Sequence, residues 1–442
     1  MNPEQSREES VEILATRARR AAVDLAALSA DVKNGALSAV RDALVRRRET
    51  ILEANRQDMD AAARLVEAGE MTEAMRKRLD LSGTKFDGML AGIDDLLKLP
   101  DPVGNVDYAV RLDQGLELYR VSAPLGVIGV IFEARPEAAV QISTLTLKSS
   151  NAVILKGGRE ADRSNRALVQ AMREGIRAAG VPPDAVQLIA TRQEVQAMLD
   201  LDHLIDLIIP RGSNELVRAI QSGTRIPVLG HADGICSVYV DREAELAKAV
   251  SVVLDAKTQY PAVCNAAETL LVHRDALSTV LPELGRRLTE AGVELRADAE
   301  SLPHLSAAAP ATEEDFRTEF LDLVLAVKTV GSVEEAVDHV NSHGSHHTDA
   351  IVTESEEAAS YFLARTDSAG VFHNASTRFA DGFRYGLGAE VGVSTNKTHA
   401  RGPVGLEGLV IYKYKLLGNG QGVVDYGPGK KPFLHEAIEI EN

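Results

Sequence analysis

The run VIGVIF at residues 127–132 starts the segment that decides the fold. Six apolar residues in a row, most of them β-branched, are typical of a β-strand. A second short run, AVILK at 152–156, is followed by an amphipathic helical stretch over 164–179. Short apolar strands that alternate with helices indicate an α/β chain with a mostly parallel, doubly wound sheet.

The alternation continues well beyond these two strands. Further strands are expected over 185–189, 204–209 and 227–229, with a helix over 214–222. A second series then predicts a second α/β domain, with strands over 235–240, 269–272, 323–327, 350–353 and 371–373 and helices over 244–254, 276–291 and 333–341.

The two ends of the chain have a different character. In the first hundred residues, apolar side chains such as Val11, Leu14, Ala18 and Ala22 recur at helical spacing, which predicts helices with almost no strand. Near the other end, the run over 409–416 is strand-like and stands alone. We expect such a late strand to pair across a domain or a subunit.

Composition excludes several classes of protein. The 442 residues are 45% hydrophobic and 26% charged, which is typical of an ordinary α/β enzyme. No apolar run approaches the roughly 18 residues of a membrane helix, and the net charge of −17 disfavours nucleic acid and anionic membranes as partners. Glu4, Glu8, Glu9 and Glu12 argue against a targeting peptide, and with only two unpaired cysteines we expect a cytoplasmic protein.

The two cysteines lie in different sequence surroundings. Cys264 is on a polar, Pro-containing turn just before the expected strand over 269–272, where a thiol is exposed enough to react. A reactive thiol must ionise, because the thiolate is the nucleophile. The alternative is a buried structural cysteine, which suits Cys236 in its apolar run better. The residues around Cys264 leave both interpretations open for that thiol.

Two polar turns follow expected strands and precede expected helices. One is Lys156-Gly157-Gly158-Arg159, and the other is Pro210-Arg211-Gly212-Ser213-Asn214. Ligands of open α/β sheets bind beyond the carboxyl ends of the strands, and a helix N-terminus offers free N–H groups to a pyrophosphate. Together the turns suggest a dinucleotide site, although each one alone is also compatible with purely local hydrogen bonding.

Two other patterns are weaker. The glycine-rich run at 418–422 resembles part of a dinucleotide fingerprint, but too few residues follow it to build a βαβ unit. His339, His343, His346 and His347 have a spacing close to that of metal ligands. The first two are expected at a helix end, where histidine often interacts with free carbonyls, so no metal site is expected.

Eight runs of the sequence, taken in order, make the chain similar to the aldehyde dehydrogenase superfamily. They are 124–136, 147–158, 206–212, 233–236, 256–273, 374–379, 386–390 and 399–403. The resemblance implies two doubly wound α/β domains and a small β element for oligomerisation. Residues 1–107 and 121–231 would bind NADP, 232–385 would form the catalytic domain, and 108–120 with 386–442 would bridge or oligomerise.

The resemblance also implies roles for individual residues. Cys264 would be the nucleophile. Lys156, with Gly157, would hold the adenosine ribose or its phosphate, and Arg159 would favour NADP because a cation suits a 2′-phosphate. Gly212 and Ser213 would meet the pyrophosphate, and Glu319 would hold the nicotinamide ribose.

Two departures from the wider superfamily narrow the expected activity. Arg135 stands about where an Asn usually stabilises the oxyanion, and Val228 lies where hydrolytic members carry a general-base Glu. Both departures suit an enzyme that exchanges its acyl group with phosphate rather than with water. Asn265, Arg378 and Arg401 would bind the substrate carboxylate or phosphate, and an interdomain salt bridge is an equal alternative for the two arginines.

The resemblance therefore implies NADPH-dependent reduction of L-glutamyl 5-phosphate to L-glutamate 5-semialdehyde through a thioacyl intermediate on Cys264. This reaction is the second step of proline biosynthesis. The alternatives are an NADP-dependent aldehyde dehydrogenase that hydrolyses its thioester, and a catalytically inactive protein on the same fold. A homo-oligomer is expected, with a transient contact to glutamate 5-kinase, which makes the acyl phosphate.

Overall fold

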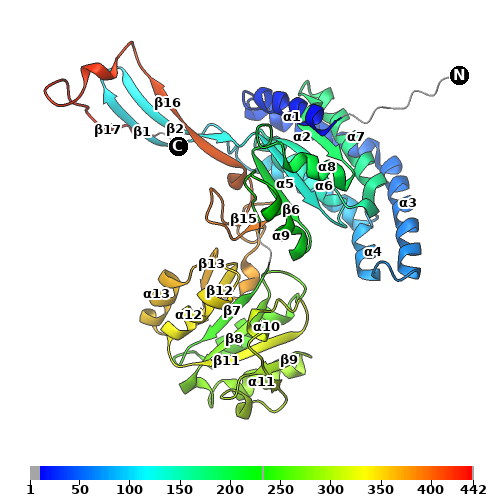
Figure 1. The fold of residues 1–442 in the computed structure, drawn as a ribbon, viewed down its shortest axis with the longest axis vertical. Coiled ribbons are helices and arrows are strands. Elements are labelled where there is room, and N and C mark those ends of the chain that lie inside the picture. Colours follow the sequence, from blue (N-terminus) through cyan, green and yellow to red (C-terminus); the bar gives the residue numbers. More distant parts are fainter. Residues whose placement is uncertain (1–9, 231–232, 441–442) are drawn as a thin grey trace.

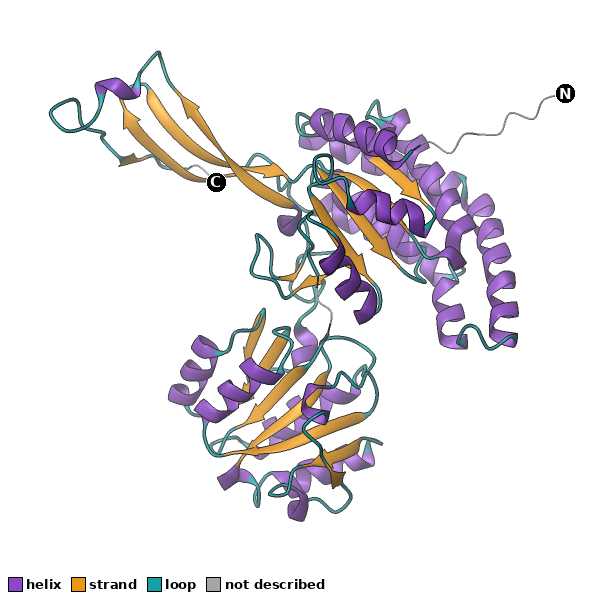
Figure 2. Ribbon diagram, viewed as in Figure 1, coloured by secondary structure: helices purple, strands orange, loops and turns teal. Residues whose placement is uncertain are grey.

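The structure is a computed structural model that describes residues 10–230 and 233–440 (Figure 1). Residues 1–9, 231–232 and 441–442 lie outside the described part. The expectations placed on Glu4, Glu8 and Glu9, and the expected domain boundary at 231–232, therefore have no structural description. The described residues form two α/β domains and an arm of antiparallel strands that projects away from both (Figures 1 and 2).

The first α/β domain is built on a four-stranded parallel sheet in the order β5-β4-β3-β6. Its strands are β3 (Val127–Phe132), β4 (Ala152–Lys156), β5 (Val186–Ile189) and β6 (Leu207–Arg211). The connecting helices are α6 (Glu137–Lys148), α7 (Asp162–Ala178), α8 (Arg192–Leu199) and α9 (Asn214–Gly223). Because all four strands are parallel, the turns after Phe132, Lys156 and Arg211 meet at one edge of the sheet. The strand expected over 227–229 is only a single bridge between Ile208 and Val228.

Five helices precede this sheet and extend its core, as the helical spacing predicted. They are α1 (Val11–Leu25), α2 (Ala30–Arg46), α3 (Arg48–Glu67), α4 (Glu73–Leu79) and α5 (Thr84–Lys98). Helix α2 crosses α7 at very short range: a Cβ on Gly175 would lie 2.6 Å from the Ala39 carbonyl oxygen and from the Val40 Cα. Glycine at this crossing lets the N-terminal helices pack directly on the sheet domain.

The second α/β domain has a seven-stranded parallel sheet in the order β10-β9-β11-β8-β7-β12-β13. Its strands are β7 (Cys236–Val240), β8 (Ala267–His273), β9 (Glu294–Ala297), β10 (Ala309–Pro310), β11 (Val324–Val330), β12 (Thr348–Val352) and β13 (Gly370–His373). The helices are α10 (Leu246–Thr258), α11 (Leu281–Glu290), α12 (Val333–His343) and α13 (Glu356–Arg365). The sequence pattern predicted this domain but not the short strands β9 and β10 at one side of the sheet.

The arm is a four-stranded antiparallel sheet in the order β16-β2-β1-β17. Its strands are β1 (Val106–Asp113), β2 (Leu116–Pro124), β16 (Val410–Leu417) and β17 (Glu436–Ala437), and a separate pair joins β14 (Val393–Ser394) to β15 (Gly402–Pro403). The late strand β16 thus pairs with β2 of its own chain. Every residue of β16 after Val410 is exposed, so one layer of strands stands without a covering layer (Figure 2).

Candidate active site

The turn that carries Cys264 joins the end of α10 to the start of β8. Cys264 is half-buried, whereas Cys236 lies on β7 and is fully buried. The Cys236 thiol points at the turn and donates to the Cys264 carbonyl oxygen at 3.2 Å. Burial raises the pKa of Cys236 well above its usual value, so this thiol remains protonated. Of the two thiols, Cys264 is therefore the one that a ligand can reach.

The chain just before β7 passes directly behind the Cys264 turn. A Cβ on Gly234 would lie 2.4 Å from both the Cα and the carbonyl oxygen of Cys264. No larger residue fits there without moving the turn, because real Cβ contacts are never that short. Gly234 thus fixes how deep the cysteine sits.

Two hydrogen bonds hold the Cys264 turn against the loop that follows β13. The Asn265 side-chain amide donates to the Ala380 carbonyl oxygen at 2.9 Å, and the Thr377 hydroxyl donates to the Asn265 carbonyl oxygen at 2.7 Å. The Asn265 Oδ1 is buried and has no hydrogen-bond partner among the described residues. In this structure the expected substrate ligand Asn265 connects two loops, and its amide nitrogen is already engaged.

The same loop brings Arg378 to the cysteine. The Arg378 side chain is largely buried, and its Nε donates to the Gln259 side-chain oxygen at 2.9 Å. Burial lowers the pKa of Arg378, the cation of Arg384 lowers it further, and Asp381, Asp255 and Cys264 oppose the shift. Through its bond to Gln259, Arg378 lies beside the turn that carries Cys264.

Arg401 is placed differently. Its guanidinium donates to a carboxylate oxygen and to the main-chain oxygen of Asp367, both at 3.1 Å, and to the Thr395 carbonyl oxygen at 3.3 Å. Lys397 pairs with the same carboxylate at 2.6 Å. Asp367 belongs to the second α/β domain, so Arg401 makes the interdomain ion pair that was the alternative to substrate binding.

The turn after β4 carries two cations. Lys156 is half-buried and Arg159 is exposed, and neither side chain makes a hydrogen bond or ion pair with another residue in 10–230 or 233–440. Gly157 is buried, and a Cβ on it would lie 2.1 Å from the Asn165 amide nitrogen. The two cations are therefore available to a phosphate, whereas Gly157 is needed for close packing. This arrangement fits the adenosine end of a dinucleotide.

One acidic residue of this turn was not expected from the sequence. The Glu160 carboxylate accepts the Ala134 main-chain N–H at 2.8 Å and lies over Gly158. It connects the turns after β3 and β4 and thus holds the shared edge of the sheet in place. Its only sequence signal is its place next to Arg159.

The turn after β6 leads into α9 through Gly212 and Ser213, both exposed. The Ser213 hydroxyl caps the helix by accepting the Leu216 N–H at 3.4 Å, and the Ser213 N–H donates to the Glu133 carboxylate at 3.3 Å. A carboxylate thus already lies at the helix N-terminus, where the resemblance places a pyrophosphate.

Glu319 comes from the second domain to the same helix. The Asn214 amide nitrogen donates to the Glu319 carboxylate at 3.1 Å and to the Asp233 carboxylate at 2.7 Å. The structure therefore brings together Ser213, at the start of α9, and Glu319, which lie far apart in the sequence. The two expected cofactor positions become neighbours through Asn214.

A buried ion pair lies close to the cysteine turn and was missed by sequence reasoning. Lys257 and Glu268 are both fully buried, with Nζ and Oε2 2.6 Å apart. Burial lowers the pKa of Lys257 and raises that of Glu268 to about 7. The second Glu268 oxygen accepts the Leu321 N–H at 3.3 Å, where the backbone φ is 55°. Glu268 thus supports the loop that carries Glu319.

Arg135 follows the end of β3 and is exposed, after Ala134 with a φ of 44°. Its guanidinium makes no hydrogen bond or ion pair with any other residue that the structure describes. The expected oxyanion residue is therefore available to a ligand at the same sheet edge as the cofactor turns.

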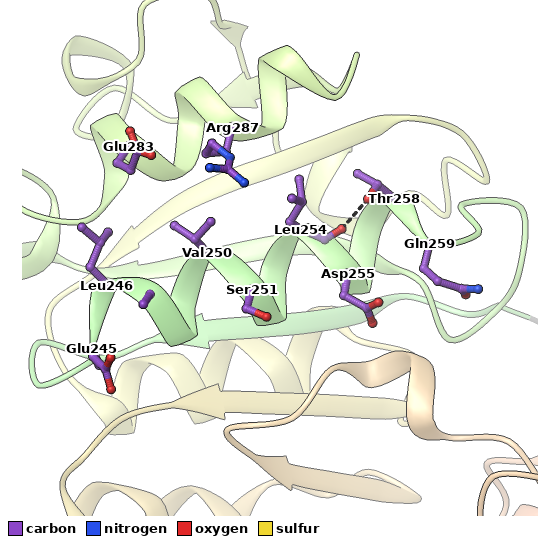
Figure 3. A pocket seen from close by; sticks show the side chains of 11 residues that line it. Glu245, Leu246, Val250, Ser251, Leu254, Asp255, Thr258, Gln259, Glu283 and Arg287 are labelled. Carbon is purple, nitrogen blue, oxygen red and sulfur yellow. Dashed lines mark hydrogen bonds between the residues drawn. The ribbon is translucent and has the colours of Figure 1, made fainter.

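A groove of about 900 Å³ lies between α10 and α11 (Figure 3). Leu246, Val250 and Leu254 line it, with Glu283 and Arg287 on the facing helix. Only its end at Gln259 adjoins the cysteine site, because Gln259 holds Arg378. Within the described part of the chain, no cluster of three or more possible metal ligands is found, and no helix is long and apolar enough to cross a membrane.

Comparisons with known proteins agree with this arrangement. The model of the aldehyde dehydrogenase family matches residues 1–308. A gamma-glutamyl phosphate reductase of Cyanothece sp. is 54% identical over 426 residues, which are 96% of this chain and 97% of that protein. One from Methanococcoides burtonii is 52% identical over 430 residues, 96% of each chain.

A solved structure supports the fold over nearly the whole length. The crystal structure of gamma-glutamyl phosphate reductase from Thermotoga maritima is 39% identical and superposes with a TM-score of 0.91. The similarity covers 94% of this chain and 100% of that one. The aldehyde-dehydrogenase-like α/β fold expected from the sequence is thereby confirmed. The chain belongs to the aldehyde dehydrogenase family, a family of oxidoreductases.

Proposed function

We propose that this enzyme reduces L-glutamyl 5-phosphate to L-glutamate 5-semialdehyde and phosphate with NADPH, in the second step of proline biosynthesis. The observation that carries the proposal is the similarity to gamma-glutamyl phosphate reductases, with 52% and 54% sequence identity over almost the whole chain. The reachable Cys264 beside Arg378, and the free cations of the cofactor turns, support the same reaction.

In the proposed mechanism, Cys264 attacks the carbonyl carbon of the acyl phosphate. The new S–C bond forms as the C–O bond to phosphate breaks, and the thiol proton leaves with the phosphate. The Cys264 main-chain N–H and Arg135 stabilise the oxyanion of the tetrahedral intermediate. When bound, the reduced nicotinamide supplies hydride. Collapse of the resulting tetrahedral intermediate breaks the C–S bond, which releases the aldehyde and leaves Cys264 as the thiolate.

The cofactor preference follows from the cations after β4. Lys156 and Arg159 would hold the adenosine end, and Arg159 offers a charge-assisted hydrogen bond to a 2′-phosphate. Gly212, Ser213 and Glu319 would position the pyrophosphate and the nicotinamide ribose. Since Glu133 already accepts the Ser213 N–H, the pyrophosphate would have to displace this carboxylate or bind beside it.

Val228, at the position where hydrolytic relatives carry their general base, separates this function from hydrolysis. Hydrolytic relatives activate water with a Glu at the position of Val228. Here the Val228 carbonyl oxygen accepts the Asn396 amide at 2.8 Å, and its side chain cannot accept a proton. Water should therefore attack the thioester slowly, because general-base help is worth roughly 10²–10⁴-fold.

The reverse reaction tests the proposal. Semialdehyde and NADP without phosphate should give a burst of NADPH of about one per active site, and phosphate should turn the burst into steady turnover. With NAD, turnover should be much slower. Rapid phosphate-free turnover that yields glutamate would instead support the hydrolytic alternative.

The arm supports a second part of the proposal, a homo-oligomer. Strand β16 at the edge of the arm is exposed on both faces after Val410, and stable sheets normally bury at least one face. Tyr412, Tyr414, Leu416 and Leu417 are all at least half exposed on β16. A second copy of the chain would cover them.

The two unpaired cysteines support a cytoplasmic location.

A further inference from the structure

Arg211 is the last residue of β6 and lies at the sheet edge where the proposed chemistry takes place. Its Cα pairs in register with Phe132, the last residue of β3, and Arg135 follows three residues later. The turn after β4, which lies on the other side of β3, carries the free cations of the cofactor site. Arg211 therefore ends the strand that pairs with β3, and β3 leads directly to the expected oxyanion residue.

The Arg211 guanidinium is half-buried and has no hydrogen-bond or ion-pair partner among the residues that the structure describes. The charged groups near it are Arg135, Glu390, Cys264 and Glu137. Burial is the main cause that lowers the pKa of Arg211, and the like charge of Arg135 adds to it. Within the described part of the chain, neither of the nearby carboxylates forms an ion pair with Arg211, so this half-buried cation lies near a second cation and its donors are not engaged.

Such an arrangement is costly unless a ligand supplies negative charge. Two guanidinium groups in the neighbourhood of a nucleophile suit a dianion, because each can donate two parallel N–H groups to phosphate oxygens. Arg378 is less suited to this task, since its Nε is already engaged by Gln259. Arg401 is engaged by Asp367.

We propose that Arg211 binds the phosphate group of the acyl phosphate and holds it as it leaves, which makes Arg211 a catalytic residue of the reaction. This inference rests on the proposed function. In the forward direction, the thiol proton and the electron pair of the breaking C–O bond both go to phosphate, which leaves as the hydrogen phosphate dianion beside Arg211. In the reverse direction, Arg211 holds the attacking phosphate against the thioester on Cys264.

The test uses the reverse reaction with two acceptors in the wild-type enzyme and in Arg211→Met. Semialdehyde and NADP give the thioacyl enzyme, which either phosphate or the uncharged thiol 2-mercaptoethanol can release, the latter by thioester exchange. In Arg211→Met, we expect the NADPH burst and the thiol-dependent turnover to stay within about twofold of wild type. The KM for phosphate should rise by about 10- to 100-fold, the usual effect of removing a hydrogen bond to a charged group.

Two further variants complete the experiment. Arg211→Lys keeps the charge but loses the planar pair of donors, so its KM for phosphate should lie between the other two values; it also decides the question if Arg211→Met does not fold. Arg225→Met is the matched control, because this arginine is 82% exposed in the same domain and, among the described residues, pairs with Asp202 alone. It should behave as wild type.

Equal losses with phosphate and 2-mercaptoethanol would overturn the inference, since Arg211 would then act on Cys264 or the cofactor. An unchanged KM for phosphate in both Arg211 variants would overturn it as well. Failure of the proposed function would be seen differently: the wild-type enzyme would then turn over rapidly with no phosphate or other acceptor added.

Discussion

Cys264 and Cys236 touch each other through a hydrogen bond, yet their surroundings predict opposite consequences of substitution. Cys264→Ala removes the only reachable thiol of the turn, so kcat should fall by at least about 10³-fold while cofactor binding is retained. Cys236→Ala loses only a weak bond to the Cys264 carbonyl oxygen and should keep most of the activity. Steady-state rates and cofactor titration measure both effects. Substantial activity in Cys264→Ala would contradict a covalent mechanism.

The buried pair of Lys257 and Glu268 gives a prediction about stability. Lys257→Met leaves the Glu268 carboxylate buried without its cation, which typically costs about 3–5 kcal/mol. Combining Lys257→Met with Glu268→Gln removes both charges and keeps an acceptor for the Leu321 N–H. The single variant should therefore melt well below wild type, and the double variant should recover most of the loss. Thermal unfolding followed by circular dichroism compares the three proteins.

If the loss of stability in the double variant equalled the sum of the losses in the two single variants, this coupling would be contradicted. Cofactor binding gives a second measurement, because Glu268 supports the loop that carries Glu319. The Lys257→Met single variant should bind NADPH more weakly than the double variant does.

The contrast between Cys264 and Lys257 shows what a sequence reveals about single residues. Cys264 stands out because a thiol on a polar turn is locally unusual. Lys257 looks like any helical lysine, and its burial follows only when α10 packs on β8 beside Glu268. For the same reason, the sequence did not predict the role of Arg211 or the contact of Asn214 with Glu319, since both depend on how the two domains meet.

Among the elements, those with a strong apolar pattern were predicted best. Strands β3 and β4 have the bounds expected from VIGVIF and AVILK, because buried parallel strands are apolar on both faces. The hairpin of β1 and β2 was not predicted from the apolar pattern, since its many polar and partly exposed residues give no clear alternation. Only the family resemblance implied a β element that includes residues 108–120. Residues 227–229 looked like a strand but form one bridge, to Ile208 of β6. The next donor of β6 on that side would be Pro210, which has no main-chain N–H, so the ladder does not continue.

Helix α12 makes stability depend on pH. His339 is 5% exposed, lies edge-on to Phe316, and stacks on His343 with ring centres 4.1 Å apart. Burial lowers the pKa of His339 to about 3. In the unfolded chain a histidine has a pKa of about 6.5. Between about pH 6.5 and pH 3, His339 is therefore protonated in the unfolded chain and neutral in the folded chain. Stability should therefore fall as the pH drops from about 6.5 towards 3, by about 1.4 kcal/mol per unit from this group.

His339→Phe keeps a ring at this position and removes the titration. Its melting temperature should drop less between pH 7 and pH 5 than that of wild type. Replacing the exposed His203 by Asn is the control and should leave the difference unchanged. Equal acid sensitivity of His339→Phe and wild type would assign the pH dependence to other groups.

For the whole molecule, the arm decides whether one chain is a stable unit. Tyr412, Tyr414 and Leu416 alternate along β16 and so share one face, and Arg120 of β2 stacks on Tyr412 at 5.0 Å. If a second copy covers this face, Tyr414→Glu with Leu416→Glu places two charges in an apolar interface. The double variant should form smaller assemblies than wild type in sedimentation velocity, at equal protein concentration.

The fold should survive these substitutions, because Tyr414 pairs across the sheet with Arg120 and a glutamate there gains an opposite charge. Lys413→Glu is the matched control on the other face of β16, and it should leave the assembly intact. Loss of assembly in the control alone would move the interface to that other face. A wild-type protein that sediments as a monomer at all concentrations would contradict the role proposed for the arm, because its exposed tyrosines and leucines would then stay in water in the active enzyme.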